Sequence, residues 1–221
     1  DLDFPRSPFI DGKFRKGSGS LMATLNPATG KQITKIYTAD AMDVDLAVAK
    51  AREAFDQGSW SKVHPSERKN IMIRLCKLIT RNSRELAVME SLDSGKPIRD
   101  CELTDIPEAI HAIKWHAEAK YKLYDQTAPT GEDAFSMIIR EPIGVVAAIL
   151  PWNFPILMLA WKIGAALATG YSVIVKPAEQ TSLTALRLAE LAMEAGIPQG
   201  VLQVLPGDGP SVAEPLGGIW G

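Results

Sequence analysis

Cysteine and histidine are scarce in this chain of 221 residues, which holds two cysteines and three histidines. Cys76 and Cys101 form no C-x-x-C pair, and the scattered histidines lack the spacing of a metal site, so no bound metal is expected. Two isolated thiols fit a reducing compartment better than a disulfide scaffold. The first residues also lack the basic and apolar regions of a signal peptide. Together these features predict a cytoplasmic protein.

An excess of charge of either sign is also missing. The 24 lysines and arginines nearly balance the 26 aspartates and glutamates, which gives a formal net charge of −2. This balance gives no electrostatic case for nucleic acid, and no block of like charge suggests a binding tail. The composition, 46% hydrophobic and 23% charged, is ordinary for a soluble globular protein.

Residues 142–161 carry no charge over 20 positions, which is long enough to span a bilayer. Pro151, Asn153 and Pro155 lie in the middle of this run. They would break a transmembrane helix and leave backbone polar groups unsatisfied in lipid. We therefore expect a buried strand, a turn and a buried helix here, and no membrane.

The strand expected at residues 143–150 begins a regular alternation. Its eight residues have no charge and no hydrogen-bonding side chain, which is typical of a strand buried on both faces. The next predicted elements are a helix over about 156–168 that ends near Gly170 and a strand over 172–176. A helix from Thr181 to Gly196 and a strand over 201–205 come after them. This β-α-β-α-β order predicts an α/β fold with a doubly wound, Rossmann-like parallel sheet.

The first half of the chain predicts short strands and turns followed by helices. Residues 8–38 contain an Asp-Gly hairpin turn and an Asn-Pro-Ala-Thr-Gly turn. Amphipathic patterns predict helices over 43–56, from Pro65, around Leu86–Leu92, and over 105–120. Residues 127–133 are polar and turn-like, and residues 135–140 predict a strand that could be an edge element or an interface arm.

Polar residues follow each of the three parallel strands, at Asn153, at Lys176 and Glu179, and at residues 207–209. Parallel strands place their carboxyl ends at one edge of a sheet, so these segments should converge where doubly wound folds bind nucleotides. An acid after the second strand can accept both hydroxyls of a ribose, and a nearby lysine can donate to the same sugar. The first turn lacks G-x-G-x-x-G, so it cannot cradle a pyrophosphate in the ordinary way.

Each of these residues also has a simpler interpretation. Lys176 and Glu179 could form a surface ion pair, and Gly207 and Gly209 could simply make a turn. Asn153 could cap the helix that follows it. Only the convergence of the three segments favours a functional site.

The thiols and histidines are weaker candidates. Cys76 lies beside the apolar stripe of its helix, which indicates a small core residue. Cys101 lies between two acidic residues, which oppose thiolate formation. His111 and His116 are five residues apart, about 140° around a helix, so a two-histidine metal site is disfavoured.

Three segments of the second half resemble the NAD(P)-dependent aldehyde dehydrogenase superfamily: PWNFP at 151–155, AWKIGAALATG at 160–170 and VKPAEQT at 175–181. NPATG at 26–30 and EPIGV at 141–145 are similar to its N-terminal signatures. The resemblance covers residues 8 to about 210. DSGKP at 93–97, with residues 105–107 and 115–119, looks most like members that act on aminoaldehydes such as γ-glutamyl-aminobutyraldehyde.

The resemblance implies oxidation of a small aldehyde with NAD or NADP as cofactor, in a homo-oligomer. It implies that Asn153 donates to the oxyanion of a thiohemiacetal. It also implies that Lys176 and Glu179 contact the adenosine ribose and that Gly209 lies beside the adenine. The remaining implied residues are the floor under the cofactor, Ile149, Leu150, Pro151 and Trp152, and the wall of the aldehyde tunnel, Phe154, Leu157 and Trp161.

Several features depart from the family pattern. The family's nucleophilic cysteine, general-base glutamate and second glycine-bearing turn would lie beyond residue 221, and neither cysteine of this chain matches the nucleophile. The tail at 213–221 also departs from the family, with Pro215 where a helix should run. The implied organisation is an incomplete, truncated cofactor-binding domain at 1–125 and 143–221, the first arm of an oligomerisation domain at 126–142, and no catalytic domain.

We therefore expect a cofactor-binding fragment of an aldehyde dehydrogenase that is catalytically inert alone. The first alternative is a nucleotide-binding or subunit-interaction module without catalysis. The second is a partly folded fragment whose sheet exposes an unpaired edge.

Overall fold

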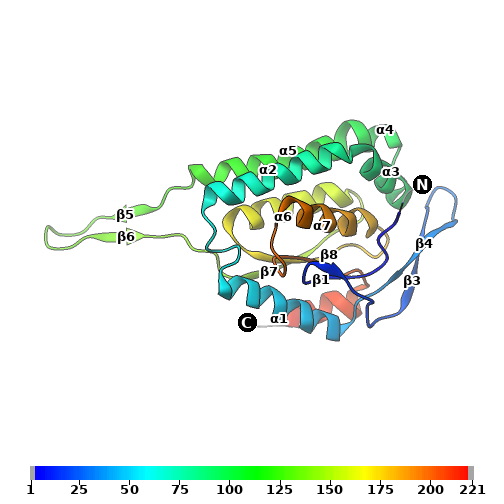
Figure 1. Cartoon of the computed structure of the whole chain (residues 1–221), viewed down its shortest axis with the longest axis horizontal. Helices are drawn as coiled ribbons and strands as arrows, with labels where there is room; N and C mark the ends of the chain where they lie inside the picture. The colour runs from blue at the N-terminus through cyan, green and yellow to red at the C-terminus, as the bar shows by residue number, and fades with distance from the viewer. Residues whose placement is uncertain (1–2, 219–221) are drawn as a thin grey trace.

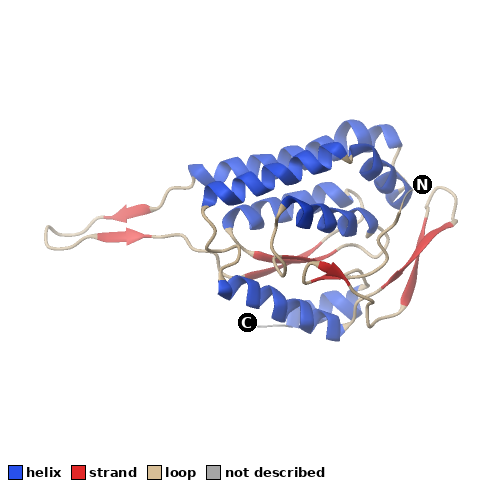
Figure 2. Cartoon of the chain, in the orientation of Figure 1, coloured by secondary structure: helices blue, strands red, loops and turns tan. Residues whose placement is uncertain are grey.

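A five-stranded sheet lies between layers of helices in the computed structural model, which describes residues 3–218 (Figures 1 and 2). The strand order is β2-β1-β9-β8-β7. The three strands of the predicted alternation, β7 (Val145–Ile149), β8 (Ser172–Lys176) and β9 (Leu202–Val204), run parallel to one another. The predicted doubly wound α/β fold is confirmed.

Helices cover both faces of this sheet (Figure 1). Helices α6 (Pro155–Thr169) and α7 (Leu183–Ala195) pack on one face, and α1 (Ala41–Gln57) packs on the other with the short α8 (Glu214–Gly218). A further layer contacts α6 and α7 from outside. It consists of α2 (Pro65–Arg81), α3 (Ser83–Ser94), α4 (Ile98–Asp100), the π-helix η1 (Cys101–Asp105) and α5 (Ile106–Ala119). Two short helical turns complete the set, η2 (Lys120–Lys122) and η3 (Gly209–Ala213).

The ends of the helices follow from the sequence signals at most positions. Pro155 occupies the first turn of α6, where its missing N–H costs no helical hydrogen bond. Gly170 ends α6 with φ of 99°, a left-handed conformation that glycine adopts without strain. Helix α7 begins at Leu183 rather than at the predicted Thr181, because Ser182 takes the capping position.

Strand β7 is not buried on both faces, so that prediction is wrong. It lies at the edge of the sheet and, within residues 3–218, pairs only with β8. Ala147 and Ile149 on one face are exposed, and Ile149 keeps 54% of its surface accessible. An apolar run predicts a strand, but the burial of that strand also depends on its place in the order of the sheet. Strand β8, in the interior of the sheet, is the one that is buried throughout.

Two N-terminal hairpins confirm the predicted turns. Strands β1 (Phe9–Ile10) and β2 (Lys13–Phe14) join through an Asp-Gly turn with positive φ at both residues. Because β1 pairs antiparallel with β9, the main sheet is mixed rather than wholly parallel. Strands β3 (Leu21–Leu25) and β4 (Gln32–Tyr37) form a separate hairpin around the predicted turn at 26–30.

A third hairpin projects away from the rest of the molecule (Figure 1). Strand β6 (Ser136–Ile138) lies in the predicted strand, but β5 (Gln126–Ala128) occupies the start of a segment that was expected to be turn-like. Residues 126–128 form a strand because they pair with β6, and this pairing cannot be predicted from the local composition. Apolar side chains on or beside β6 are exposed, at Phe135, Met137, Ile138 and Ile139.

The remaining predictions about residue placement have mixed outcomes. Cys76 lies in the core, as predicted. Pro215 does not interrupt helical structure, because α8 begins one residue before it and tolerates proline in its first turn. Within residues 3–218, no helix is both long and apolar enough to cross a membrane.

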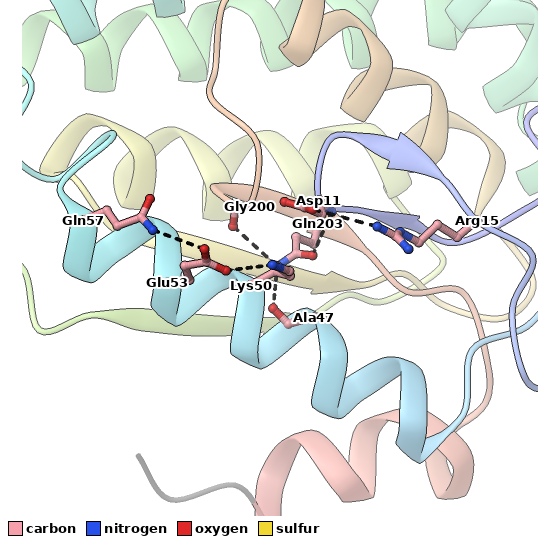
Figure 3. A network of polar contacts seen from close by, with 8 residues as sticks. All are labelled: Asp11, Arg15, Ala47, Lys50, Glu53, Gln57, Gly200 and Gln203. Carbon is pink, nitrogen blue, oxygen red and sulfur yellow. Dashed lines mark hydrogen bonds and ion pairs between the residues drawn. The ribbon is translucent and has the colours of Figure 1, made fainter.

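Buried Gln203 on β9 connects the sheet to α1 and to the β1–β2 turn (Figure 3). Its side-chain amide donates to the carbonyl oxygen of Ala47 at 2.5 Å, and its Oε1 accepts from the backbone N–H of Asp11 at 3.2 Å. The nearby Lys50–Glu53–Gln57 chain lies on the surface of α1 (Figure 3). The bonds that Gln203 donates to Ala47 and Gly200 are buried, and the bond that it accepts from Asp11 is partly buried.

We expect Gln203→Leu to lower the free energy of unfolding by about 1–3 kcal/mol, because it leaves a buried backbone donor and acceptor without this partner. Urea denaturation of the chain measures the change. Gln57→Leu is the matched control, since its hydrogen bond is exposed and its loss should cost less than about 0.5 kcal/mol. Equal effects of the two substitutions would contradict this role for Gln203.

Candidate functional site at the carboxyl edge of the parallel strands

The segments after β7, β8 and β9 begin side by side. Ile149 pairs with Lys176 and Val175 pairs with Val204 across the parallel ladders. The next residues extend this alignment, because Leu150 N–H donates to the carbonyl oxygen of Lys176 at 3.0 Å. The predicted convergence of the three segments at one edge is therefore present.

Lys176 and Glu179 form an ion pair at this edge, but it is not an ordinary surface pair. Lys176 is 3% exposed, and its Nζ lies 3.2 Å from Glu179 Oε2 and donates to the Pro177 carbonyl oxygen at 3.0 Å. A hydrogen bond from its own backbone N–H and the charge of Lys176 lower the pKa of Glu179. Glu179 keeps 40% of its side chain accessible. The buried cation of Lys176 thus fixes a partly exposed carboxylate at the carboxyl edge of the sheet.

The segment after β9 adds a helix start. Asp208 Oδ1 accepts from Ser211 N–H at 2.8 Å, and the hydrogen bonds from Ser211 lower the Asp208 pKa. Apart from its chain neighbours and the backbone of its own helical turn, none of the described atoms lies within 4 Å of the point where a Cβ on Gly209 would be, so the space beside it is open. Gly207 differs, because a Cβ there would lie 2.5 Å from Val212. The turn interpretation therefore accounts for Gly207, whereas Gly209 borders free space.

The turn after β7 exposes Pro151, Trp152 and Asn153. The capping residue of α6 is Phe154, without a side-chain capping hydrogen bond, so the interpretation of Asn153 as a helix cap is wrong. Among the described residues, none forms a hydrogen bond with the Asn153 side chain. Its amide can therefore donate to a ligand.

One pocket borders this turn, and a groove lies further along α6. A pocket of about 480 Å³ is lined by Trp152, Glu179 and residues of the β3–β4 hairpin. A shallower groove of about 460 Å³ on the α5–α6 side is lined by Trp161, Trp115 and Glu108. His111 and His116 both border this groove, although their spacing predicted different faces of the helix.

The three residues assigned to an aldehyde tunnel lie three and four residues apart, from the N-cap of α6 into its second turn. Phe154 is 36% exposed and Trp161 is 51% exposed, whereas Leu157 is only 9% exposed. Leu157 therefore packs mainly inward within the described part of the chain. The tunnel itself stays a prediction.

Two buried carboxylates, for which the sequence analysis predicted no role, support the site. Glu90 Oε1 on α3 accepts from the backbone N–H of Ile156 in the first turn of α6, at 3.0 Å, and its Oε2 accepts from the hydroxyl of Thr184 on α7, at 2.8 Å. Asp93 Oδ2 accepts from the N–H of Leu183 at 3.0 Å, at the start of α7. Burial raises the pKa of each carboxyl to about 7. Their i, i+3 spacing on a face with buried Leu86 and Met89 is the signal that could have found them.

Neither cysteine has the exposure or the lowered pKa that a nucleophilic thiolate needs. Burial raises the pKa of the Cys76 thiol to about 11. Cys101 is fully buried, and burial together with Glu90 and Asp105 raises its pKa to about 12. The prediction that the two flanking acids oppose the Cys101 thiolate holds only for Asp100, which is the smallest of these causes; burial is the largest, and Glu90 and Asp105 outweigh Asp100.

Comparison with known proteins gives consistent matches. A model of the aldehyde dehydrogenase family matches residues 14–218. The match extends to residue 218 and therefore includes much of the tail at 213–221, while the expected departure of single tail residues from the family pattern stays a prediction. Residues 219–221 lie outside the described part of the chain.

Individual relatives are longer than this chain. The aminoacetaldehyde dehydrogenase of Pseudomonas aeruginosa is 58% identical over 217 residues, which are 98% of this chain and 44% of the relative. The NADP/NAD-dependent aldehyde dehydrogenase PuuC of Escherichia coli is 45% identical over 94% of this chain and 42% of its own. The structure of a mutant P. syringae indole-3-acetaldehyde dehydrogenase, AldA, in complex with NAD+ and IAA has a TM-score of 0.96 at 47% identity, covering 98% of this chain and 44% of that one. The chain thus spans less than half of each of these relatives.

The buried carboxyl of Glu90 predicts a pH dependence of stability. Its pKa rises from 4.5 to about 7 on folding, so between these values the folded chain holds a proton that the unfolded chain has lost. The free energy of unfolding should therefore fall as the pH rises through this window. Glu90→Gln removes this titration and should flatten the fall between about pH 5 and 8, measured by urea denaturation.

Glu194→Gln on the exposed side of α7 is the matched control and should leave the pH profile unchanged. Asp93 keeps its own contribution in both variants. A Glu90→Gln profile as steep as that of the unsubstituted chain would show that Glu90 does not carry the effect.

Proposed function

The chain belongs to the aldehyde dehydrogenase family, and we propose that it forms the cofactor-binding part of an enzyme that oxidises an aldehyde to a carboxylic acid with NAD(P)+. The observation that carries this proposal is the convergence of Asn153, of the Lys176–Glu179 pair and of Gly209 at the carboxyl edge of three parallel strands. Nucleotides bind at such edges in doubly wound folds.

The residues at this edge fit a dinucleotide. Glu179 offers a carboxylate that stays ionised at neutral pH, which suits the two hydroxyls of a ribose. Lys176 holds that carboxylate in place and adds a positive charge beside it. The open space at Gly209 leaves room for a flat adenine. Of the residues assigned to the cofactor floor, Ile149, Pro151 and Trp152 offer exposed apolar surface, whereas Leu150 is buried. When bound, NAD(P)+ accepts the hydride that the aldehyde carbon loses.

Asn153 supplies the charge stabilisation in this proposal. A nucleophile that adds to the aldehyde carbon drives the carbonyl electron pair onto oxygen, and the Asn153 amide N–H donates to that oxyanion. Because its side chain is exposed, no protein hydrogen bond has to break first. Phe154 at the N-cap of α6, with Leu157 and Trp161 within the helix, would contact the rest of the aldehyde.

The attacking thiolate must come from outside these 221 residues. Cys76 and Cys101 are buried and have raised pKa values, so each stays a thiol at neutral pH. In the whole enzyme, water then releases the acid from the acyl-thiol intermediate. We infer that this chain alone does not turn over aldehydes.

The substrate class that we favour is an aldehyde that carries an amino group. Support comes from the 58% identity to an aminoacetaldehyde dehydrogenase and from the DSGKP segment at 93–97. The segment at 126–142 projects from the rest of the molecule (Figure 1). Its exposed apolar residues, Phe135, Met137, Ile138 and Ile139, support a homo-oligomer in which another copy covers them.

Calorimetric titration of the chain with NAD+ tests the cofactor site. We expect measurable binding, and we expect Lys176→Ala to weaken it about tenfold, since it removes one charged contact and frees the Glu179 carboxylate. Lys77→Ala on the exposed side of α2 is the control and should bind as the unsubstituted chain does. No aldehyde-dependent NADH should form with any of these proteins.

Different failures have different meanings. If NAD+ and NADP+ both fail to bind the folded chain, the proposed cofactor site is wrong as it stands. If aldehyde-dependent NADH forms, the assignment of the nucleophile outside this chain is wrong. Binding without turnover, reduced in Lys176→Ala alone, supports the proposal.

A further inference from the structure

The turn that carries Asn153, residues 151–154, contains little that fixes its own orientation. Phe154 begins α6 without a side-chain cap, and the Asn153 side chain has no hydrogen bond among the described residues. An oxyanion donor has to hold its direction closely, because small misplacements of reacting groups cost large factors in rate. Contacts from other elements must therefore set the orientation of the turn.

Lys96 makes one of these contacts. Its Nζ lies 3.6 Å from the centroid of the Phe154 ring, close enough for a strong cation–π interaction. Phe154 is the residue directly after Asn153, so the direction of its ring is coupled to the direction of the turn. Lys96 follows α3, far from the turn in the sequence.

Lys96 is itself fixed at both ends. Its Nζ lies 2.5 Å from Oδ2 of Asp105, a carboxylate that is 1% exposed. Its carbonyl oxygen accepts from the hydroxyl of Ser91 at 2.7 Å, and its N–H donates to Ser94 Oγ at 3.3 Å. A flexible lysine is thereby converted into a fixed cation above the ring.

A second contact from the same part of the chain fixes the backbone two residues after Phe154. Glu90 accepts the backbone N–H of Ile156 at 3.0 Å. Glu90 and Lys96 thus engage residues 156 and 154 and leave Asn153 itself uncovered. Glu90 is deep in the core, whereas Lys96 is 20% exposed, so Lys96 can be changed with less damage to the fold.

We propose that Lys96 is a positioning residue that directs Asn153 through the face of the Phe154 ring, with Asp105 holding its ammonium group. This inference rests on the proposed function, in which Asn153 donates to the oxyanion. It assigns to Lys96 an effect on the chemical step and none on cofactor affinity. No contact between Lys96 and the substrate or cofactor is required.

The test is steady-state kinetics of the full-length enzyme that contains this chain, with Lys96→Met, Lys96→Arg and the control Lys77→Met. Lys96→Met keeps the side-chain length and removes the charge, so kcat should fall about ten- to a hundredfold while KM for NAD+ stays within about twofold. Lys96→Arg restores a cation over the ring and should recover most of kcat. Lys77→Met should match the unsubstituted enzyme.

A double-mutant cycle with Phe154→Leu separates positioning from general damage. If Lys96 acts through the ring, the double variant should be no slower than the slower single variant, so the two effects should not multiply. Should Lys96→Met fail to fold, Phe154→Leu keeps the Lys96–Asp105 pair and must itself lower kcat. An unchanged kcat in Phe154→Leu would overturn the proposal.

The remaining outcomes distinguish this inference from the proposed function. An unsubstituted full-length enzyme that binds no NAD(P)+ and oxidises no aldehyde rejects the proposed function. An active enzyme in which Lys96→Met keeps its kcat, or in which Lys96→Arg is as slow as Lys96→Met, rejects the role of Lys96 alone.

Discussion

Two buried carboxylates on one helix hold the starts of the two helices that leave the site. The first backbone N–H groups of a helix lack partners within that helix and have to be satisfied by something else. Glu90 accepts from Ile156 in α6, and Asp93 accepts from Leu183 in α7. Because α6 and α7 begin at the carboxyl edge of the sheet, their position fixes the turns that carry Asn153 and Glu179. The site therefore depends on α3, which belongs to a different layer of the molecule.

The sequence predicted the parts of the fold that local patterns encode, and it missed those that depend on neighbours. The alternation after residue 143 predicted three parallel strands and their shared edge, and both are present. The burial of β7 was predicted wrongly, because an apolar run does not show whether the strand lies inside the sheet or at the edge of the sheet. The same limit applies to β5, which is a strand only because β6 lies beside it.

In the candidate site, too, some residues could be predicted from local patterns and others could not. Asn153, Lys176 and Glu179 could be named from their place after the strands, yet the burial of Lys176 could not, since a lysine at a strand end is usually exposed. Glu90 and Lys96 were invisible as site residues because their partners lie more than fifty positions away. Their types are ordinary for a helix and a loop, and only tertiary packing gives them a role.

In the proposed function the binding groups and the nucleophile come from different parts of the enzyme, so this chain alone has to position the turn that carries Asn153. The described residues present an amide, an ion pair and apolar surface, while both thiols are buried with raised pKa values. A thiolate contributed from elsewhere can work with Asn153 only if each is held independently in the right direction. The Asn153 turn cannot take its orientation from the nucleophile, so contacts within this chain must set it. Glu90 and Lys96 make two of these contacts, and the hydrogen bond from Leu150 N–H to the Lys176 carbonyl oxygen is another.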